Sequence, residues 1–200
     1  QSIARGEPIT PLLLRQLQGI LLQDIERVGV GSFRTENVAI NGATHQPPDF
    51  HDVPELVAAV CQHLGEADDQ VHPIQLAAWA HWAIARSHPF RDGNGRLARL
   101  VQDYRLLRQH YVPAPLRSED REGLYYEALD RADSGDGQPL LEIVAKNTLR
   151  MADRYASLIA EEESKRSWIT AITKAATEKV KQSDHRRFLA LQRSFANLKA

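Results

Sequence analysis

The sequence lacks three features that mark specialised classes of protein: a set of cysteines, a large excess of one charge, and a long apolar run. The single cysteine, Cys61, excludes an internal disulfide framework and is typical of a reducing compartment, so we expect a cytoplasmic protein. The formal net charge of -1 gives no overall attraction to DNA or RNA. Neither an apolar run that could cross a membrane nor a signal peptide is visible, so we expect no membrane association.

Glycine and proline are unevenly distributed, because neither occurs after Pro139. The stretch 140–200 therefore predicts one or more long helices. Its last part is rich in Lys and Arg, including Arg186 and Arg187. Such a run is more typical of a solvated helix face than of a nucleic-acid patch, so we do not expect nucleic acid as a partner of this domain.

The 200 residues begin with Gln1 rather than Met, so we expect a piece of a longer protein. The content of 42% hydrophobic and 26% charged residues is ordinary for a globular domain. This length fits one large domain, or one domain with an appendage.

Apolar residues recur at helical spacing through most of the chain. The first such helix begins after Thr10, a candidate N-cap, with Pro11 at its first position. The same periodicity and further capping residues predict helices near 52–66, 72–87, 97–107 and 118–133.

One segment breaks this helical pattern. Val38 and Ile40 alternate with polar residues, and the pair Asn41-Gly42 follows at once. Asn-Gly after an alternating run predicts a tight hairpin turn, because both turn residues must adopt a positive φ. We therefore expect an all-α fold, mainly a helical bundle, with one small β-hairpin near residues 33–45.

The densest chemistry lies between His88 and Leu100, in the run HPFRDGNGRLARL. One helix should end just before this run and the next apolar stripe begins inside it, so the run predicts a tight loop that enters a helix N-terminus. Such an N-terminus presents free N–H groups and a positive dipole end, which attract phosphate. Gly93 and Gly95 let the backbone approach a ligand closely, and Asn94 between them could donate to an oxyanion.

Charged residues of the same run complete a site for a nucleoside triphosphate. Arg96 and Arg99 lie three residues apart, so they share a helix face where two guanidinium groups suit the outer phosphates. Asp92 offers a hard oxygen ligand for Mg²⁺. His88 can be neutral near pH 7, as a general base must be. Together these residues predict phosphoryl or nucleotidyl transfer.

Other interpretations of this run remain open. Asp92 and Asn94 match the first and third positions of a calcium loop, although Arg96 and Leu97 stand where a ligand and a glycine belong. The run could also be an ordinary capped loop between helices, or its Asn-Gly pair could form a hairpin turn. Three histidines could bind zinc, although no cysteine partner or HExxH spacing supports this: His72, His81 and His88.

The run is similar to the signature of the Fic family, His-x-Phe-x-[Asp/Glu]-Gly-Asn-Gly-Arg-x-x-Arg. The resemblance extends from about Pro11 to about Met151, and it implies the Fic fold, a compact helical bundle with a β-hairpin flap. We therefore expect a Fic domain at 1–155 and a C-terminal helical extension at 156–200, which could lead to a further domain outside this sequence. Every fixed position of the signature is matched: His88, Phe90, Asp92, Gly93, Asn94, Gly95, Arg96 and Arg99.

The resemblance implies transfer of AMP from ATP to a Ser, Thr or Tyr hydroxyl of a target protein. It assigns His88 as the general base and Asp92 as the ligand of Mg²⁺. A related branch that transfers phosphate typically has Ala-Asn-Lys-Arg, so the Gly-Asn-Gly-Arg form here favours AMP; transfer of another phosphate-containing group is the alternative. The remaining signature residues would bind phosphates: Gly93, Asn94 and Gly95 as the anion hole, Arg96 and Arg99 at the β- and γ-phosphates.

Three residues beyond the signature are candidates for the adenosine side of the site: Tyr125, Tyr126 and Asp133. The two tyrosines could instead belong to the core or the rim. The flap at 33–45 would hold a segment of the target protein as an added strand, which positions a side chain without reading much sequence.

Many members of the family are silenced by a helix with the pattern [Ser/Thr]-x-x-x-Glu-[Gly/Asn], whose Glu pairs with the second signature arginine, here Arg99. Glu7 follows a serine by one residue too many, and Glu161 has the right spacing but is followed by Glu162. Inhibition would therefore come from a segment outside this sequence or from a separate small protein, or it is lacking. The alternative function is a nucleotide-binding or protein-interaction module with little activity, whose basic C-terminal helices bind the partner.

Overall fold

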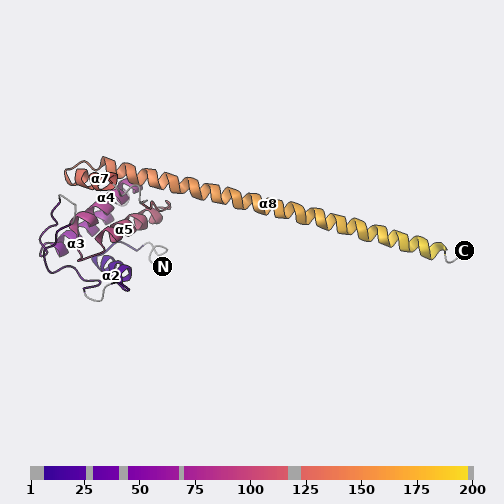
Figure 1. Cartoon of the computed structure of the whole chain (residues 1–200), viewed down its shortest axis with the longest axis horizontal. Coiled ribbons are helices and arrows are strands. Elements are labelled where there is room, and N and C mark those ends of the chain that lie inside the picture. The colour runs from indigo at the N-terminus through magenta and orange to yellow at the C-terminus, as the bar shows by residue number, and fades with distance from the viewer. Residues whose placement is uncertain (1–6, 26–28, 41–44, 68–69, 117–122, 198–200) are drawn as a thin grey trace. The chain divides into compact units, whose positions relative to one another are not determined.

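A computed structural model describes residues 7–25, 29–40, 45–67, 70–116 and 123–197 (Figure 1). The chain divides into two compact units, Gln1–Ala152 and Asp153–Ala200. Among the described residues the regular elements are all helices, which confirms the predicted all-α class. They are α2 (Pro11–Leu22), α3 (Val53–Glu66), α4 (Pro73–Ser87), α5 (Asn94–Arg108), α7 (Leu124–Asp133) and α8 (Gln138–Asn197).

The helix α2 begins where the sequence predicts. Thr10 has an extended backbone, and its hydroxyl accepts a hydrogen bond from the N–H of Leu13 at 3.1 Å. Pro11 occupies the first helical position, where its missing N–H costs nothing. At the start of α3, in contrast, the side chain of Asp52 makes no capping hydrogen bond, although Asp52 is the N-cap residue.

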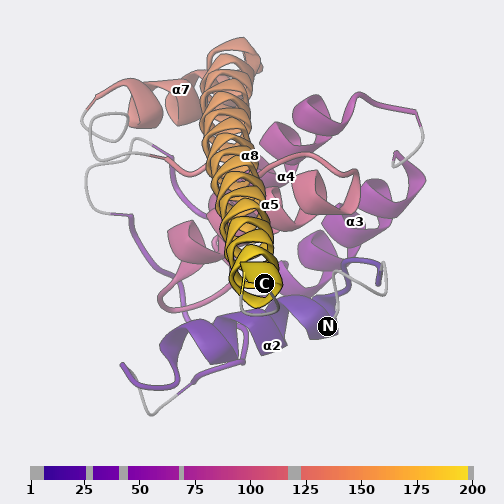
Figure 2. The same ribbon diagram turned by 90° about the vertical axis from the view of Figure 1, so that its right-hand side faces the viewer.

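The helices α4 and α5 form the central pair of the first unit, and they pack on each other more extensively than any other two helices. α3 packs on α4, α2 packs on α5 and α3, and α7 packs on α4. Figure 2 shows this arrangement from a second direction. α4 and α5 follow each other in the chain and are joined by a short loop. The other helices of the first unit pack on this pair.

That loop is anchored by an apolar side chain. Phe90 is fully buried in the main core, with its ring centroid 5.4 Å from that of Phe33. The core around it is built from residues of all four neighbouring helices, among them Leu14, Val57 and Leu97. Burial of a large aromatic side chain stabilises such a loop by a few kcal/mol, on the order of 3.

The predicted turn and the predicted long helix both follow α7. After α7, Gly135 adopts a positive φ of 96°, and α8 begins at Gln138. Leu140 and Val144 of α8 are buried in the first unit. The absence of glycine and proline after Pro139 thus correctly predicted a long helix. None of the helices in the described ranges combines the length and apolarity needed to cross a membrane.

The expected β-hairpin at 33–45 is not seen in the part of the chain that the structure describes. Residues 29–40 and 45–50 contain no strand, and the Asn41-Gly42 turn lies outside the described residues. The carbonyl oxygens of Glu36 and Pro48 accept hydrogen bonds from the side chain of Arg34 instead of from a partner strand. Pro47-Pro48 also supplies no N–H groups for a ladder.

The burial pattern of α2 gives a matched pair of variants for stability. Leu14 is 0% exposed and Leu12 is 62% exposed, so the same change can be made on either face of one helix. We expect Leu14→Ala to lower the free energy of unfolding by about 2–5 kcal/mol, because it leaves a cavity. Leu12→Ala should change it by less than about 0.5 kcal/mol in chemical denaturation. Equal effects of the two variants would contradict this core.

Candidate active site

The loop between α4 and α5 reverses the chain through two residues with positive φ. His88 caps α4 with φ 44° and ψ 54°, and Gly93 precedes α5 with φ 82°. Between them, the buried side chain of Asn94 accepts from the N–H of Phe90 at 2.9 Å and donates to its carbonyl at 2.8 Å. This reciprocal pair of hydrogen bonds fixes the loop at the start of α5.

One N–H of the Asn94 side chain is therefore committed to the Phe90 carbonyl, and donation of its second N–H to an oxyanion stays a prediction. The amide is 2% exposed, and both its oxygen and its nitrogen are engaged by one backbone residue. What α5 offers to an anion is its backbone, because the first N–H groups of a helix have no carbonyl one turn earlier. A Cβ at Gly95 would lie 3.6 Å from a guanidinium nitrogen of Arg99, beside this helix start.

The geometry of His88 defines which ring nitrogen carries the proton. Nδ1 lies 3.3 Å from the carbonyl oxygen of Ala85, which can only accept, so Nδ1 donates and Nε2 keeps a lone pair. Burial lowers the pKa of His88 below its ordinary value of 6.5, and the charge of Arg34 and a neighbouring His45 act in the same direction. The Ala85 carbonyl and Asp92 oppose this shift. The net effect favours the neutral imidazole.

Asp92 is held by its neighbours in a definite orientation. One carboxylate oxygen accepts from the N–H of Gly93 at 2.5 Å, and the other pairs with Arg96 at 2.8 Å. The carbonyl of Asp92 accepts from the side chain of Gln18 in α2 at 3.2 Å, and the oxygen of Gln18 accepts from the N–H of Gly31 at 2.5 Å. Gln18 is 2% exposed, so a buried amide in α2 supports the loop.

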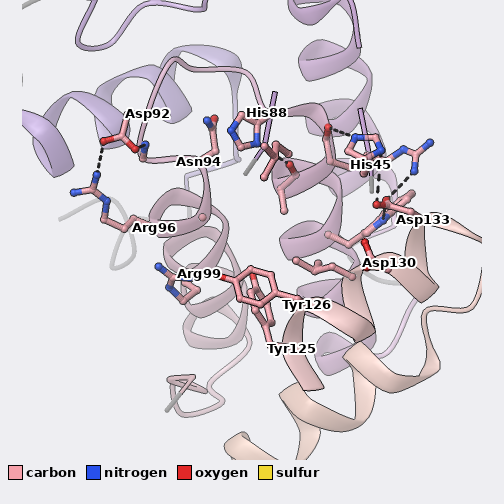
Figure 3. Close-up of a pocket in the computed structure, with 17 residues that line it drawn as sticks. His45, His88, Asp92, Asn94, Arg96, Arg99, Tyr125, Tyr126, Asp130 and Asp133 are labelled. Atoms are coloured by element: carbon pink, nitrogen blue, oxygen red, sulfur yellow. Dashed lines mark hydrogen bonds and ion pairs between the residues drawn. The ribbon is translucent and has the colours of Figure 1, made fainter. Parts of the chain in front are cut away.

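A cavity of about 330 Å³ opens in front of this loop. In the view of Figure 3, Asp92 and Arg96 lie to one side of His88, and His45 and Asp133 lie to the other. The lining brings together all the residues that the sequence singled out for the site: His88, Asp92, Gly93, Asn94, Gly95, Arg96, Arg99, Tyr125, Tyr126 and Asp133.

Tyr125 and Tyr126 differ in their surroundings although both line the cavity. Tyr126 is 58% exposed, whereas Tyr125 is 4% exposed and its hydroxyl lies 2.8 Å from Nε2 of His81. Nδ1 of His81 lies 2.9 Å from the oxygen of Gln102, whose nitrogen donates to the carbonyl of Ala114. The amide oxygen of Gln102 can only accept, so Nδ1 of His81 donates to it. Nε2 of His81 therefore accepts a hydrogen bond from the hydroxyl of Tyr125.

Burial keeps His81 neutral. The residue is 0% exposed, and burial lowers the pKa of His81 to about 4; the charge of Arg99 acts in the same direction, and the hydrogen bond that His81 donates to Gln102 opposes both. Tyr125 is thus mainly a core residue whose ring edge reaches the cavity, which is the alternative that the sequence left open.

Asp133 forms the polar end of the cavity away from Asp92. One carboxylate oxygen accepts from the indole N–H of Trp82 at 2.8 Å and from Arg86 at 2.7 Å. The other lies 3.7 Å from Nδ1 of His45, whose Nε2 donates to the carbonyl of Arg86 at 3.0 Å. The guanidinium of Arg86 also lies over the Trp82 ring, 5.4 Å from its centroid.

Sequence reasoning missed the residues that reach the cavity or its loop from other elements. Trp82 and Arg86 lie on α4 at i and i+4, so helical spacing alone would have placed them on one face. For Gln18, Arg34 and His45 the sequence carries no such signal, because their contacts span long separations. Ile40, Ala85, Leu129 and Asp130 complete the lining.

The donor set fits Mg²⁺ bound together with phosphates, and it does not fit zinc. The described residues contain no group of three or more His, Cys, Asp or Glu side chains that could hold a metal ion. His72 instead caps α4 by accepting from the N–H of Ile74, and His81 is consumed by its buried network. Asp92 is half-exposed at the cavity, and one carboxylate with substrate phosphates is a usual magnesium arrangement.

Comparison with known proteins gives a consistent result. A family model described as "Fic/DOC family" matches residues 8–106. The protein adenylyltransferase Fic of Nematostella vectensis is 34% identical over 154 residues, which cover 76% of this chain and 35% of that protein. This chain therefore spans about a third of the length of that curated relative.

Solved structures show the same similarity in three dimensions. Fic-1 from C. elegans superposes with a TM-score of 0.70 and 29% identity, over 78% of this chain and 45% of that one. A Fic domain containing signaling protein from Bacteroides thetaiotaomicron gives a TM-score of 0.69 and 25% identity, over 75% of this chain and 63% of that one. The helical arrangement of the first unit is thus one that solved proteins share.

The two tyrosines provide a test of the buried network. We expect Tyr125→Phe to lower the free energy of unfolding by about 1–3 kcal/mol, because Nε2 of His81 then has no donor in a buried site. Tyr126→Phe removes the same atom from an exposed ring and should change stability by less than about 0.5 kcal/mol. Chemical denaturation of both variants measures this, and a Tyr125→Phe protein as stable as Tyr126→Phe would disprove the network.

Proposed function

This chain belongs to the Fic/DOC family through its residues 8–106, and we propose that it transfers AMP from ATP to a Ser, Thr or Tyr hydroxyl of a target protein. One observation carries the proposal. A histidine with an unprotonated Nε2 and a lowered pKa lines the same cavity as a helix N-terminus flanked by two arginines. The curated relative of Nematostella vectensis is named as a protein adenylyltransferase, which supports the same reaction.

In the proposed reaction His88 is the general base. Nε2 takes the proton of the target hydroxyl, and the hydroxyl oxygen forms a bond to the α-phosphorus of ATP. The bond from this phosphorus to the bridging oxygen breaks, and pyrophosphate leaves with the electron pair. The hydrogen bond from Nδ1 to the Ala85 carbonyl fixes the ring and stabilises the imidazolium that forms.

The start of α5 is the proposed phosphate cradle. Backbone N–H groups from Asn94 to Arg96 and the positive end of the helix dipole favour an anion there. The side chains of Arg96 and Arg99 line the cavity beside them and suit the β- and γ-phosphates. A Cβ at position 95 would lie in ordinary van der Waals contact, 3.6 Å from a guanidinium nitrogen of Arg99, so Gly95 and Arg99 adjoin the same space.

Asp92 is the proposed ligand of Mg²⁺. Each of its oxygens has one partner in the structure and so retains a lone pair for a cation. When bound, Mg²⁺ would neutralise part of the phosphate charge that develops on departing pyrophosphate. The ion pair with Arg96 keeps this carboxylate at the phosphate end of the cavity.

The opposite end of the cavity is the proposed adenosine side. The apolar surface of Ile40, Leu129 and the Tyr126 ring suits a purine, and Asp133 lies beside them. The segment 33–45, with its stem held at Arg34, is proposed to bind the target protein as an added strand. Main-chain hydrogen bonds to an added strand would position the target side chain without reading much of its sequence.

Two further assignments stay proposals. We divide the chain into a catalytic domain at 1–155 and a helical extension at 156–200, in a protein that works in a reducing compartment such as the cytoplasm. Glu161 forms an ordinary helical ion pair with Lys165 at 2.7 Å, as a surface glutamate does. The three alternatives for inhibition stay proposals: a segment outside this sequence, a separate small protein, or no inhibition.

The first test is labelling with α-phosphate-labelled ATP and Mg²⁺, in a cell lysate and on the protein itself. We expect label on protein with the wild type and a loss of at least about 100-fold with His88→Ala, because the base is removed. ATP binding by calorimetry should survive in the variant. His110→Ala, a matched histidine that does not line the cavity, is the control. Equal labelling by His88→Ala would remove the enzyme hypothesis and leave a binding module.

The pH dependence gives a second test. The base must be neutral, so activity is lost as the pH falls through the pKa of His88, which burial sets below 6.5. We expect the acidic limb of kcat/KM for ATP, which reports the free enzyme, to have its midpoint below pH 6.5. An acidic limb centred well above that value would mean that a different group is the base.

A further inference from the structure

Arg34 is a buried cation that the proposed reaction does not use. Its residue is 5% exposed, and burial lowers the pKa of its guanidinium against the opposing charge of Asp49. A buried charge costs several kcal/mol unless it is fully hydrogen-bonded. The question is therefore what this guanidinium holds together.

The guanidinium binds carbonyl oxygens from three separate segments. Nε donates to His88 at 2.9 Å, one terminal nitrogen donates to Glu36 at 3.0 Å, and the other donates to Pro48. The backbone N–H of Arg34 adds a bond to the carbonyl of Pro89 at 3.0 Å. One side chain thus joins both ends of the segment 37–47 to the residue proposed as the general base.

Asn37 closes the same segment a second time. Its nitrogen donates to the carboxylate of Asp49 at 2.9 Å, and its oxygen accepts from the N–H of Phe50 at 2.9 Å. The oxygen also lies 3.4 Å from a terminal nitrogen of Arg34. The described ends of the segment are therefore joined by hydrogen bonds of side chains, both to backbone and to other side chains, rather than by a strand ladder.

We propose that Arg34 is a positioning residue that holds the target-binding segment and His88 in one fixed relation. The inference rests on the proposed function, because that function assigns the segment 33–45 to the target protein and His88 to the removal of the proton. Proton transfer needs the target hydroxyl within hydrogen-bond reach of Nε2, and a misplacement of about 1 Å can cost about 100-fold in rate. A guanidinium has five donors in a rigid fork, whereas a lysine ammonium in the same place could not reach all three carbonyls.

The charge of Arg34 supplies a second effect at the same residue. It favours the neutral form of His88, together with His45, while Asp92 favours the protonated form. The position and the protonation state of the base thus depend on one side chain that does not itself face the reacting atoms.

The test compares Arg34→Lys and Arg34→Gln with a matched control, Arg15→Lys. Arg15 also binds a loop carbonyl, that of Gly31 at 2.7 Å, and lies over the Phe33 ring, but it has no contact with His88 or with the described residues 37–40 and 45–47. We expect both Arg34 variants to lower kcat for a protein substrate by roughly 10- to 100-fold, with the KM for ATP within about twofold of the wild type. Arg15→Lys should leave both constants unchanged.

A readout independent of transfer is the pKa of His88 from its ring proton in NMR, assigned with His88→Ala. We expect this pKa to rise in Arg34→Gln and to stay near the wild-type value in Arg34→Lys, which keeps the charge. If the wild type transferred no AMP, this titration would still decide the link between the two residues.

Three results would overturn the inference. The first is a wild-type kcat in Arg34→Lys. The second is an unchanged His88 pKa in Arg34→Gln. The third is a parallel fall of kcat, ATP affinity and melting temperature, which would mark a purely structural role.

Discussion

The site depends on one tight reversal of the chain between two consecutive helices. His88 ends α4 in the left-handed region, Gly93 begins α5 in the same region, and the Asn94 side chain binds both backbone groups of Phe90 between them. A buried aromatic ring then ties the loop to the core. This geometry puts the end of one helix, with its histidine, beside the start of the next, with its unpaired N–H groups. The other contacts described for the site hold this loop in place or belong to residues that line the cavity in front of it.

Electrostatics and burial act together on this loop. The helix start and two arginines form a positive region that suits phosphates, and a histidine inside such a region is favoured in its neutral form. Arg34 adds a buried positive charge on the side of the loop that faces the core, and its fork binds the His88 carbonyl. The features that would hold the nucleotide and the base are therefore physically coupled. A side chain at position 34 that did not bind the same three carbonyls would leave the loop in a different position.

Local patterns predicted what local physics determines. The helix boundary at Ser87, the cap at Thr10 and the phosphate-binding character of 88–99 all follow from neighbours in sequence, and the structure agrees on the two helix features. The hairpin is not seen in the described residues, where the side chain of Arg34 binds the carbonyls of Glu36 and Pro48 instead. Tyr125 could not be separated from Tyr126 without knowing that His81 and Gln102 lie beneath it. Long-range polar contacts of this kind leave no periodic signal, and Gln18 was missed for the same reason.

The central claim is that this cavity holds ATP with its α-phosphate toward His88, and a crystal structure with Mg²⁺ and a non-hydrolysable ATP analogue tests it most directly. The account predicts the β- and γ-phosphates at the start of α5 beside Arg96 and Arg99, the α-phosphate facing Nε2 of His88, and the adenine toward Asp133. A nucleotide bound in the reverse direction, with its γ-phosphate against His88, would contradict AMP transfer and point to phosphate transfer. A nucleotide bound outside this cavity would contradict the assignment of the site itself.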